Sequence, residues 1–273
     1  MRLSNKLKAN LLEQYGPWAL ITGSSSGIGR EIALRLAESG INLVLTGRQA
    51  IQLEGLSALL QAEYAIKTRT VVADLSSMSE IYELIDATSD LDIGLFVASA
   101  GYGTSGLFFQ NEAAEELRLL QVNCLALAML THYFSRSFAE RGKGGIILLS
   151  SIVGFQGVPN AANYAASKAY VQSLGEALYH ELKPYGVSVL TAAPGPVKSG
   201  FAKRADMEMG NAQEPEIIGI PILKALGKRP TVFPGRLTKT LLFGLRTVPR
   251  WGKIRIMKSV MAGMTKHQKL LRT

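Results

Sequence analysis

Short apolar runs and helical patterns alternate along the first 195 residues, and this alternation limits the possible folds more than any other feature. The runs are continuous in Val, Ile and Leu, which is typical of strands buried on both faces. Strands that alternate with helices form a parallel sheet with helices on both sides. The predicted strands are 18–23, 42–47, 68–75, 93–99, 144–151 and 186–195, with 230–235 as a candidate seventh.

The segments between the strands repeat apolar residues at a spacing near 3.6 and end at Gly or at Pro184. This spacing is typical of amphipathic helices. The predicted helices are 29–40, 50–64, 79–89, 115–141 and 163–186. The fold class is therefore α/β, with a single Rossmann-type, doubly wound parallel sheet and a C-terminal helical tail.

The composition fits one large domain or two small ones, since the chain has 273 residues and is 47% hydrophobic. The single cysteine, Cys124, excludes an internal disulfide and fits a reducing compartment. We expect no signal peptide and no membrane span, because the N-terminus lacks a long apolar run and no stretch reaches 18 uncharged apolar residues. A cytoplasmic protein, with a possible peripheral membrane contact, is the resulting expectation.

The net charge of +9 is concentrated at the C-terminus. Residues 228–273 hold 12 Lys or Arg and no Asp or Glu, which leaves 18 basic and 21 acidic residues elsewhere. We predict that 236–273 forms a basic amphipathic extension, with Trp251 near the boundary of its two faces. The predicted apolar arc is Ile254, Met257, Val260, Met261 and Met264. The predicted basic arc is Arg255, Lys258, Lys266 and Lys269.

The extension has two alternative interpretations. Its apolar arc lies in an anionic membrane surface, or it packs on the body of the protein or on a partner subunit. Nucleic-acid binding is not predicted, because interleaved aromatic residues and a known motif are lacking.

A glycine-rich turn joins the first predicted strand to the first predicted helix, in the segment 22–29. Gly23 permits the tight turn, while Gly27 and Gly29 remove side chains where the backbone approaches a pyrophosphate and where helix packs on strand. The helix N-terminus offers free N–H groups to phosphates. The other predicted cofactor contacts in this turn are Ser25, Ser26 and Ile28.

The same turn matches G-x-S-x-G, which would make Ser25 a hydrolase nucleophile. Such a serine usually follows a central strand, yet only about 17 residues precede the first predicted strand. The required histidine has three candidates, none with a clear acid partner: His132, His180 and His267. We therefore favour phosphate binding for Ser25.

The end of the second predicted strand indicates which cofactor binds. Gly47 and Arg48 stand where a binder of a ribose diol usually has an acidic residue. Because arginine pairs with a 2′-phosphate, this favours NADP over NAD; a solvated loop cation is the alternative. Asp74, at the end of the third predicted strand, binds the adenine amino group or caps the next helix.

Tyr164 and Lys168 are four residues apart in a predicted helix and share one face. A phenol has a pKa near 10, and an ammonium beside it favours the phenolate. Ser151, at the end of a predicted strand, can meet the tyrosine at the sheet edge where ligands bind. The pattern predicts a catalytic group, with two solvated helix residues as the alternative for Tyr164 and Lys168.

Together these motifs resemble the short-chain dehydrogenase/reductase family over about residues 16–200. The resemblance is carried by TGSSSGIG (22–29), ADL (73–75), Asn123, Ser151, YAASK (164–168) and PGPVKS (194–199).

The resemblance implies that Tyr164 exchanges a proton with the substrate oxygen and that Lys168 lowers the tyrosine pKa and binds the nicotinamide ribose. It implies that Ser151 orients the carbonyl and that Asn123 holds a water linked to the lysine. Further cofactor positions that it implies are Leu75, Ala98, Ser99, Ala100, Gly101, Pro194, Gly195, Val197 and Ser199. Two positions depart from the family: Ala98–Gly101 replaces Asn-Asn-Ala-Gly, and Ser199 replaces a threonine.

The predicted function is an NADP(H)-dependent oxidoreductase that interconverts a carbonyl and an alcohol. Residues 1–235 form its dinucleotide-binding catalytic domain, and the substrate loop, about 196–225, suggests an apolar substrate: acyl-chain, sterol-like or aromatic. A dinucleotide sensor or scaffold without turnover is the alternative. The resemblance also implies a homodimer or homotetramer, and no metal site is predicted.

Overall fold

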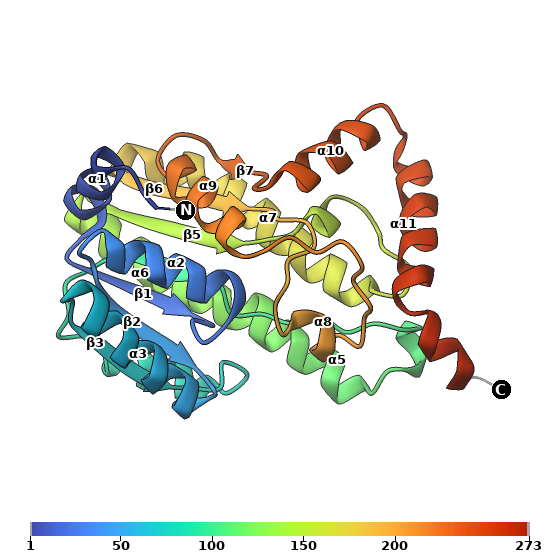
Figure 1. Ribbon diagram of the computed structural model, residues 1–273, viewed down its shortest axis with the longest axis horizontal. Helices are drawn as coiled ribbons and strands as arrows, with labels where there is room; N and C mark the ends of the chain where they lie inside the picture. The colour runs from blue at the N-terminus through green and yellow to red at the C-terminus, as the bar shows by residue number, and fades with distance from the viewer. Residues whose placement is uncertain (1, 272–273) are drawn as a thin grey trace.

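The computed structural model describes the backbone of residues 2–271 and the side chains of residues 2–268. A seven-stranded parallel sheet runs through it in the order β3-β2-β1-β4-β5-β6-β7 (Figure 1). The strands are β1 Trp18–Thr22, β2 Asn42–Gly47, β3 Thr68–Val72, β4 Ile93–Ala98, β5 Gly144–Leu149, β6 Val187–Ala192 and β7 Thr231–Val232. This confirms the predicted fold class.

Helices cover both faces of the sheet, and each face has its own apolar core. On one face the core includes side chains of α1 Asn5–Tyr15, α2 Gly27–Glu38, α3 Ala50–Tyr64 and α9 Glu216–Ala225. On the other face it includes side chains of α4 Met78–Asp86, α6 Leu127–Arg141 and α7 Ala162–Leu182. Because both faces are covered, the central strands β1, β4 and β5 are buried along almost their whole length, whereas the edge strand β3 is partly exposed.

The strand order reverses between β1 and β4, which are neighbours in the sheet but far apart in sequence. Helices that leave these two strands go to opposite faces, so a crevice opens at their carboxyl ends. In open α/β sheets this position is where ligands bind. The glycine-rich turn follows β1 and therefore lies at this crevice.

Three segments differ from the sequence prediction. Helix α1 was not expected, and the predicted helix 115–141 is divided into α5 Ala113–Leu120, a π-helical segment Gln121–Ala126, and α6. The predicted substrate loop 196–225 is also shorter than expected. Only its first part, including the short helix α8 Phe201–Arg204, is irregular, because Ile218 and Ile222 of α9 are buried against the sheet and α2.

The C-terminal extension consists of α10 Arg236–Leu245, α11 Arg250–Met264 and a 3₁₀ turn, Lys266–Leu271. Helix α11 stands at the end of the molecule farthest from α1 (Figure 1). Met257 and Met261 are only 9% and 3% exposed and pack in a third apolar cluster with Val158, Ala165 and Met207.

The packing of α11 supports the interpretation in which the apolar arc packs on the body of the protein, although Val260 of that arc is 42% exposed. Its central methionines face the body of the protein, so the arc as a whole is not a membrane surface. Within the described residues, no helix is long and apolar enough to cross a bilayer. The side chain of Lys269, assigned to the basic arc, lies outside the described residues.

Candidate active site

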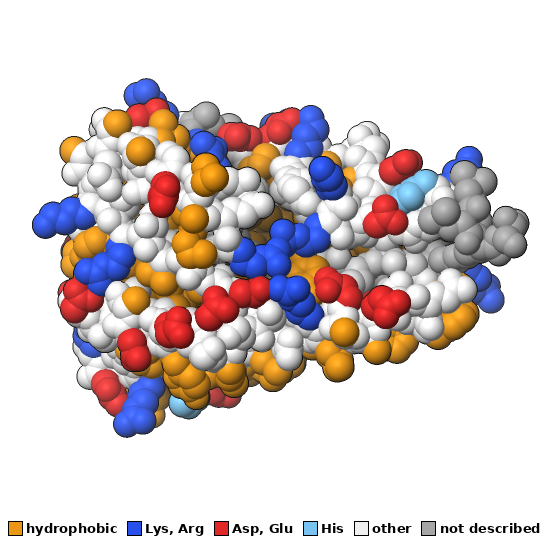
Figure 2. Space-filling view, turned by 90° about the horizontal axis from the view of Figure 1, so that it is seen from below, with side chains coloured by type: hydrophobic (Ala, Val, Ile, Leu, Met, Phe, Trp, Pro, Cys, Tyr) orange, Lys and Arg blue, Asp and Glu red, His pale blue; other side chains and the backbone are white. Residues whose placement is uncertain are grey.

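A cavity of about 1220 Å³ opens at the carboxyl ends of the central strands. It is lined by every predicted catalytic and cofactor residue except Gly29, Ala98 and Asn123. Figure 2 shows a hollow lined with hydrophobic side chains, with Lys and Arg side chains gathered at its edge. The sequence motifs are therefore brought together in one site.

The glycines of the turn after β1 allow close approach of neighbouring segments, the loop after β4 at Gly23 and Ser199 at Gly27. Gly23 and Gly27 adopt φ values of +65° and +56°, in the left-handed region that favours glycine. A Cβ on Gly23 would lie 2.8 Å from the Cα of Ala100. The turn leads directly into α2, whose first N–H groups point toward the bound phosphates of a dinucleotide in such a motif.

Gly29 lies where the packing of the helix on the turn requires a residue without a side chain, as predicted. It is buried, and a Cβ there would overlap the carbonyl oxygen of Gly23. It therefore allows α2 to pack on the turn, while Ala98 is buried in β4 and in the apolar core. Neither residue is among those that line the cavity, and their assignment as cofactor contacts stays a prediction.

The segments that follow β2 and β3 line one side of the cavity, where the sequence predicts the adenosine half of a cofactor. Arg48 follows β2 and is exposed, and Asp74 follows β3. One carboxylate oxygen of Asp74 accepts hydrogen bonds from the backbone N–H and hydroxyl of Ser76, at 3.0 and 2.8 Å, and the other pairs with Arg118. The N-cap of α4 is Ser77, so the helix-capping alternative for Asp74 is wrong.

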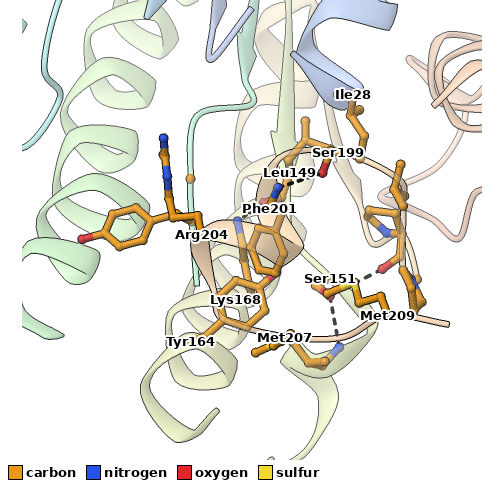
Figure 3. Close-up of a pocket in the computed structure, with 18 of the residues that line it drawn as sticks. Ile28, Leu149, Ser151, Tyr164, Lys168, Ser199, Phe201, Arg204, Met207 and Met209 are labelled. Atoms are coloured by element: carbon orange, nitrogen blue, oxygen red, sulfur yellow. Dashed lines mark hydrogen bonds between the residues drawn. The ribbon is translucent and has the colours of Figure 1, made fainter. Parts of the chain in front are cut away.

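Ser151, Tyr164 and Lys168 meet where β5 ends beside α7 (Figure 3). Burial raises the pKa of Tyr164 to about 12, and a hydrogen bond with Ser151 opposes this effect. The Lys168 ammonium donates to the carbonyl oxygen of Leu149 at 2.8 Å. Its nitrogen lies 5.9 Å from the centroid of the Tyr164 ring.

The electrostatics of this group differ from the sequence expectation. Burial lowers the pKa of Lys168 to about 8, and the tyrosine pKa is raised rather than lowered. The reason is that both groups are buried, which disfavours the charged form of each. The phenol carries its proton at neutral pH, as an unperturbed phenol with a pKa near 10 also would.

Asn123 lies behind the site rather than in it. Its amide donates to the carbonyl oxygen of Tyr102 at 2.8 Å and to the Ser167 hydroxyl at 3.0 Å, and its oxygen accepts from the Tyr102 N–H at 3.1 Å. The π-helical segment carries this fully buried side chain. Asn123 thus joins α7 to the loop after β4, and a Cβ on Gly101 would lie 3.0 Å from its oxygen.

A profile described as "short chain dehydrogenase" matches residues 17–210. The chain belongs to the short-chain dehydrogenase family. The resemblance identified from the motifs is therefore confirmed, and the match extends past the last predicted motif into the loop after β6.

Named relatives include enzymes and a protein called inactive. The chain is 30% identical over 234 residues to a "7beta-hydroxysteroid dehydrogenase" of Clostridium sardiniense, which covers 84% of this chain and 90% of that protein. It is 34% identical over 190 residues to "inactive hydroxysteroid dehydrogenase-like protein 1" of Pongo abelii, covering 68% of this chain. The chain spans only 58% of that second relative.

A solved structure with the same fold carries a cofactor. The short-chain dehydrogenase from Sphingobium yanoikuyae in complex with NADPH is 30% identical, with a TM-score of 0.76. The similarity covers 85% of this chain and 94% of that chain.

This short-chain dehydrogenase replaces the family's Asn-Asn-Ala-Gly with Ala98–Gly101, and Thr22 stabilises the altered segment. The Thr22 hydroxyl accepts from the N–H groups of Ser99 and Ala100, both at 3.1 Å. Thr22 is at the end of β1, so these bonds join β1 to the loop after β4. The Thr22 hydroxyl thus fixes the loop after β4, which lines the cavity.

The loop after β6 covers the site with residues that the sequence analysis did not single out. The rings of Phe201 and Tyr164 have centroids 5.1 Å apart, and Met207 and Met209 line the cavity beside them (Figure 3). Ser199 accepts a hydrogen bond from the N–H of Phe201 at 3.3 Å. The abundance of Met in this segment was the only sequence signal for these residues.

The extension supplies another wall of the cavity that was not predicted. The lining residues of α10 are Leu237, Thr240, Leu241, Gly244 and Leu245, and those of α11 are Ile256, Met257, Val260, Met261 and Met264. The cavity is therefore apolar on the side away from the glycine-rich turn.

The hydrolase interpretation of Ser25 lacks its histidine. All three histidines are in the described part of the chain, and none lines the cavity. His132 and His180 are exposed on α6 and α7, while His267 lies 3.0 Å from the Asp206 carboxylate. Ser25 lies instead in the turn between Gly23 and Gly27.

Proposed function

We propose that this short-chain dehydrogenase is an NADP(H)-dependent oxidoreductase that interconverts a carbonyl and an alcohol on a large apolar substrate. The observation that carries the proposal is the meeting of Ser151, Tyr164 and Lys168 at one end of a cavity, with the glycine-rich turn at the other. Family membership supports the oxidoreductase class.

The proposed chemistry is carbonyl reduction, for which bound NADPH supplies the hydride. Tyr164 donates the phenolic proton to the carbonyl oxygen, and Ser151 donates a hydrogen bond that orients it. The raised pKa of Tyr164 supports this role because the phenol carries its proton at neutral pH. Lys168, with a pKa lowered to about 8, is poised to bind ribose hydroxyls and to move protons near neutral pH.

The preference for NADP(H) rests on Arg48. This side chain is exposed at the end of β2 and lines the cavity, with Gly47 before it and no acidic residue in that turn. A guanidinium stabilises a 2′-phosphate by charge-assisted hydrogen bonds, whereas an acidic residue would bind the ribose diol of NAD.

The proposed substrate class follows from the apolar wall of the cavity. Five methionines line it: Met207, Met209, Met257, Met261 and Met264. Methionine adapts its shape to a bulky apolar ligand, and 1220 Å³ leaves room for a substrate beside the dinucleotide. A sterol-like or acyl-chain carbonyl fits this wall, and the 7beta-hydroxysteroid dehydrogenase relative supports the same class.

A panel of sterol-like, acyl-chain and aromatic carbonyls with NADPH or NADH tests the proposal. We expect turnover with NADPH, and a loss of about 10²–10⁴-fold in Tyr164→Phe with cofactor binding retained. Arg48→Asp should move the preference toward NADH. Equal use of both cofactors by the wild type would contradict the NADP(H) assignment.

The alternative is a dinucleotide-binding protein without turnover. The relative whose name calls it inactive supports this alternative. It predicts cofactor binding with no hydride transfer to any carbonyl in the panel. The presence of Tyr164, Lys168 and Ser151 in one cavity supports the enzyme over this alternative.

We propose a homodimer or homotetramer formed through α5–α7, where Leu117, Leu125, Tyr133 and Tyr170 are exposed. Light scattering on the wild type and on a Leu125→Lys variant tests this.

We also propose an anionic membrane contact for the extension, now through Phe243 and Trp251, which are 78% and 63% exposed. Basic residues near an anionic surface contribute about 1 kcal/mol each. Co-sedimentation with anionic vesicles at low and high salt tests the contact.

A further inference from the structure

The loop after β6, which carries the short helix α8 and covers the site, is called the lid below. We infer that Arg204 of α8 is a second ligand of the cofactor 2′-phosphate. By this contact it holds the lid across the adenosine end of the site. This inference rests on the proposed use of NADP(H). It assigns to a residue of the substrate-covering segment a role in cofactor discrimination.

Arg204 is placed at the border between the two halves of the site. It is the last residue of α8, lines the same cavity as Arg48, and is exposed. Its guanidinium carbon lies 5.8 Å from the centroid of the Tyr102 ring, in the loop after β4. Figure 3 shows the Arg204 side chain extending away from Tyr164 and Phe201. It also extends away from Met207 and Met209.

Three guanidinium groups gather at this point. Burial lowers the pKa of Arg204, and the charge of Arg48 lowers it further, as does that of Arg118 to a smaller extent. The charges of Arg48 and Arg118 therefore act on Arg204, which lines the same cavity as Arg48 and lies over the Tyr102 ring. They come from three different elements: the turn after β2, helix α5 and the lid.

Only one of these arginines has an acidic partner among residues 2–268. Arg118 pairs with Asp74, whereas neither Arg48 nor Arg204 forms an ion pair with a carboxylate in that part of the chain. Glu115 offsets part of the repulsion on Arg204 without forming an ion pair with it, and an anion that reaches both Arg48 and Arg204 would stabilise the two guanidinium groups at this cavity edge. Guanidinium groups bind phosphate oxygens bidentately.

The position of the pair identifies which anion it fits. The pyrophosphate of a dinucleotide lies at the glycine-rich turn, while Arg48 and Asp74 mark the adenosine end. The 2′-phosphate is the only other anionic group of NADP(H), and NAD(H) has none there. A dianion between Arg48 and Arg204 would remove their repulsion and hold α8 toward the turn after β2.

A consequence for the catalytic end follows from the length of α8. The helix has only four residues, Phe201–Arg204, and the Phe201 ring packs on Tyr164. Fastening Arg204 therefore also fixes Phe201 over the catalytic tyrosine. Cofactor bound through its 2′-phosphate would order the lid before a substrate is enclosed.

Binding of two cofactor fragments tests the assignment without turnover. The probes are adenosine 2′,5′-bisphosphate and 5′-AMP, titrated by calorimetry into the wild type, Arg204→Gln and Lys203→Gln. Lys203→Gln is the matched control, since it removes a neighbouring exposed charge from the same helix. We expect Arg204→Gln to weaken the bisphosphate about tenfold and 5′-AMP less than twofold, with little change in Lys203→Gln.

Limited trypsin digestion at Lys203 reports on the lid itself. The bisphosphate should slow cleavage after Lys203 in the wild type, 5′-AMP should not, and Arg204→Gln should abolish the protection. Equal weakening of both fragments, or of neither, in Arg204→Gln would overturn the inference.

The outcomes also separate this inference from the proposed cofactor. A wild type that binds both fragments equally contradicts the NADP(H) proposal and the inference together. A preference for the bisphosphate that Arg48→Gln removes and Arg204→Gln leaves intact supports NADP(H) and overturns the role of Arg204.

Discussion

Replacing Lys168 with Met tests how much the buried charge of this side chain lowers the unfolding free energy. The Lys168 side chain is only 6% exposed, and its ammonium donates to the Leu149 carbonyl oxygen at 2.8 Å. Burial lowers its pKa from 10.5 to about 8. Folding at neutral pH therefore buries an ammonium that stays charged, and this burial disfavours the charge relative to the unfolded chain.

The difference between the pKa values of Lys168 in the unfolded and folded chain sets the size and the sign of the pH effect on the unfolding free energy. Between pH 8 and 10.5 the unfolded chain holds a proton on Lys168 that the folded protein has released, so stability rises with pH in that window. Below pH 8 the burial of the charge costs about 3 kcal/mol. The difference in unfolding free energy between wild type and Lys168→Met should therefore change by about 2 kcal/mol from pH 7 to 9.5.

Urea unfolding of both proteins at several pH values measures this change. At pH 7, Lys168→Met removes the free-energy cost of burying the charge. It also removes the hydrogen-bond donor of the Leu149 carbonyl oxygen, which lowers the unfolding free energy by about 1–3 kcal/mol. The variant should therefore be nearly as stable as the wild type, and inactive. Lys224→Met, an exposed position on α9, is the control. Parallel stability curves for wild type and Lys168→Met across this pH range would refute the reasoning.

Three further perturbations address other parts of the structure. Thr22→Val removes the side-chain acceptor of the Ala100 N–H, while the Ser99 N–H keeps the Val97 carbonyl oxygen at 3.1 Å; the change should lower the unfolding free energy by about 1–3 kcal/mol in urea. Ser25→Ala should change turnover only modestly, and total loss with NADPH binding intact would revive a nucleophilic role. Trp251→Ser should reduce co-sedimentation with anionic vesicles, and unchanged binding would exclude this exposed ring as the membrane contact.

The sheet was predictable because its signal is local. Each strand is a short apolar run followed by a helical pattern, and both are read within one window of sequence. Ser151, Tyr164 and Lys168 were also placed together correctly, since strand ends meet at one edge and residues four apart share a helix face. Their catalytic roles stay predictions.

The segments that were missed depend on contacts distant in sequence. Helix α1 has a weak apolar pattern, and its Tyr15 hydroxyl donates to Ser188, 173 residues away, at 3.0 Å. The π-helical segment has no composition of its own, and Asn123 shows its use only through partners in the loop after β4 and in α7. Periodicity within a segment contains no information about such partners.

In the C-terminal extension, the sequence predicted the apolar face of a helix but not the residues that cover this face. A helical wheel correctly placed Met257 and Met261 on one side of α11, yet a hydrophobic stripe does not specify what covers it. Val158, Ala165 and Ala205, from three separate segments, cover these methionines. Because α11 thereby becomes a wall of the cavity, substitutions in the basic extension should alter which carbonyl is accepted, whether or not the opposite face meets a membrane.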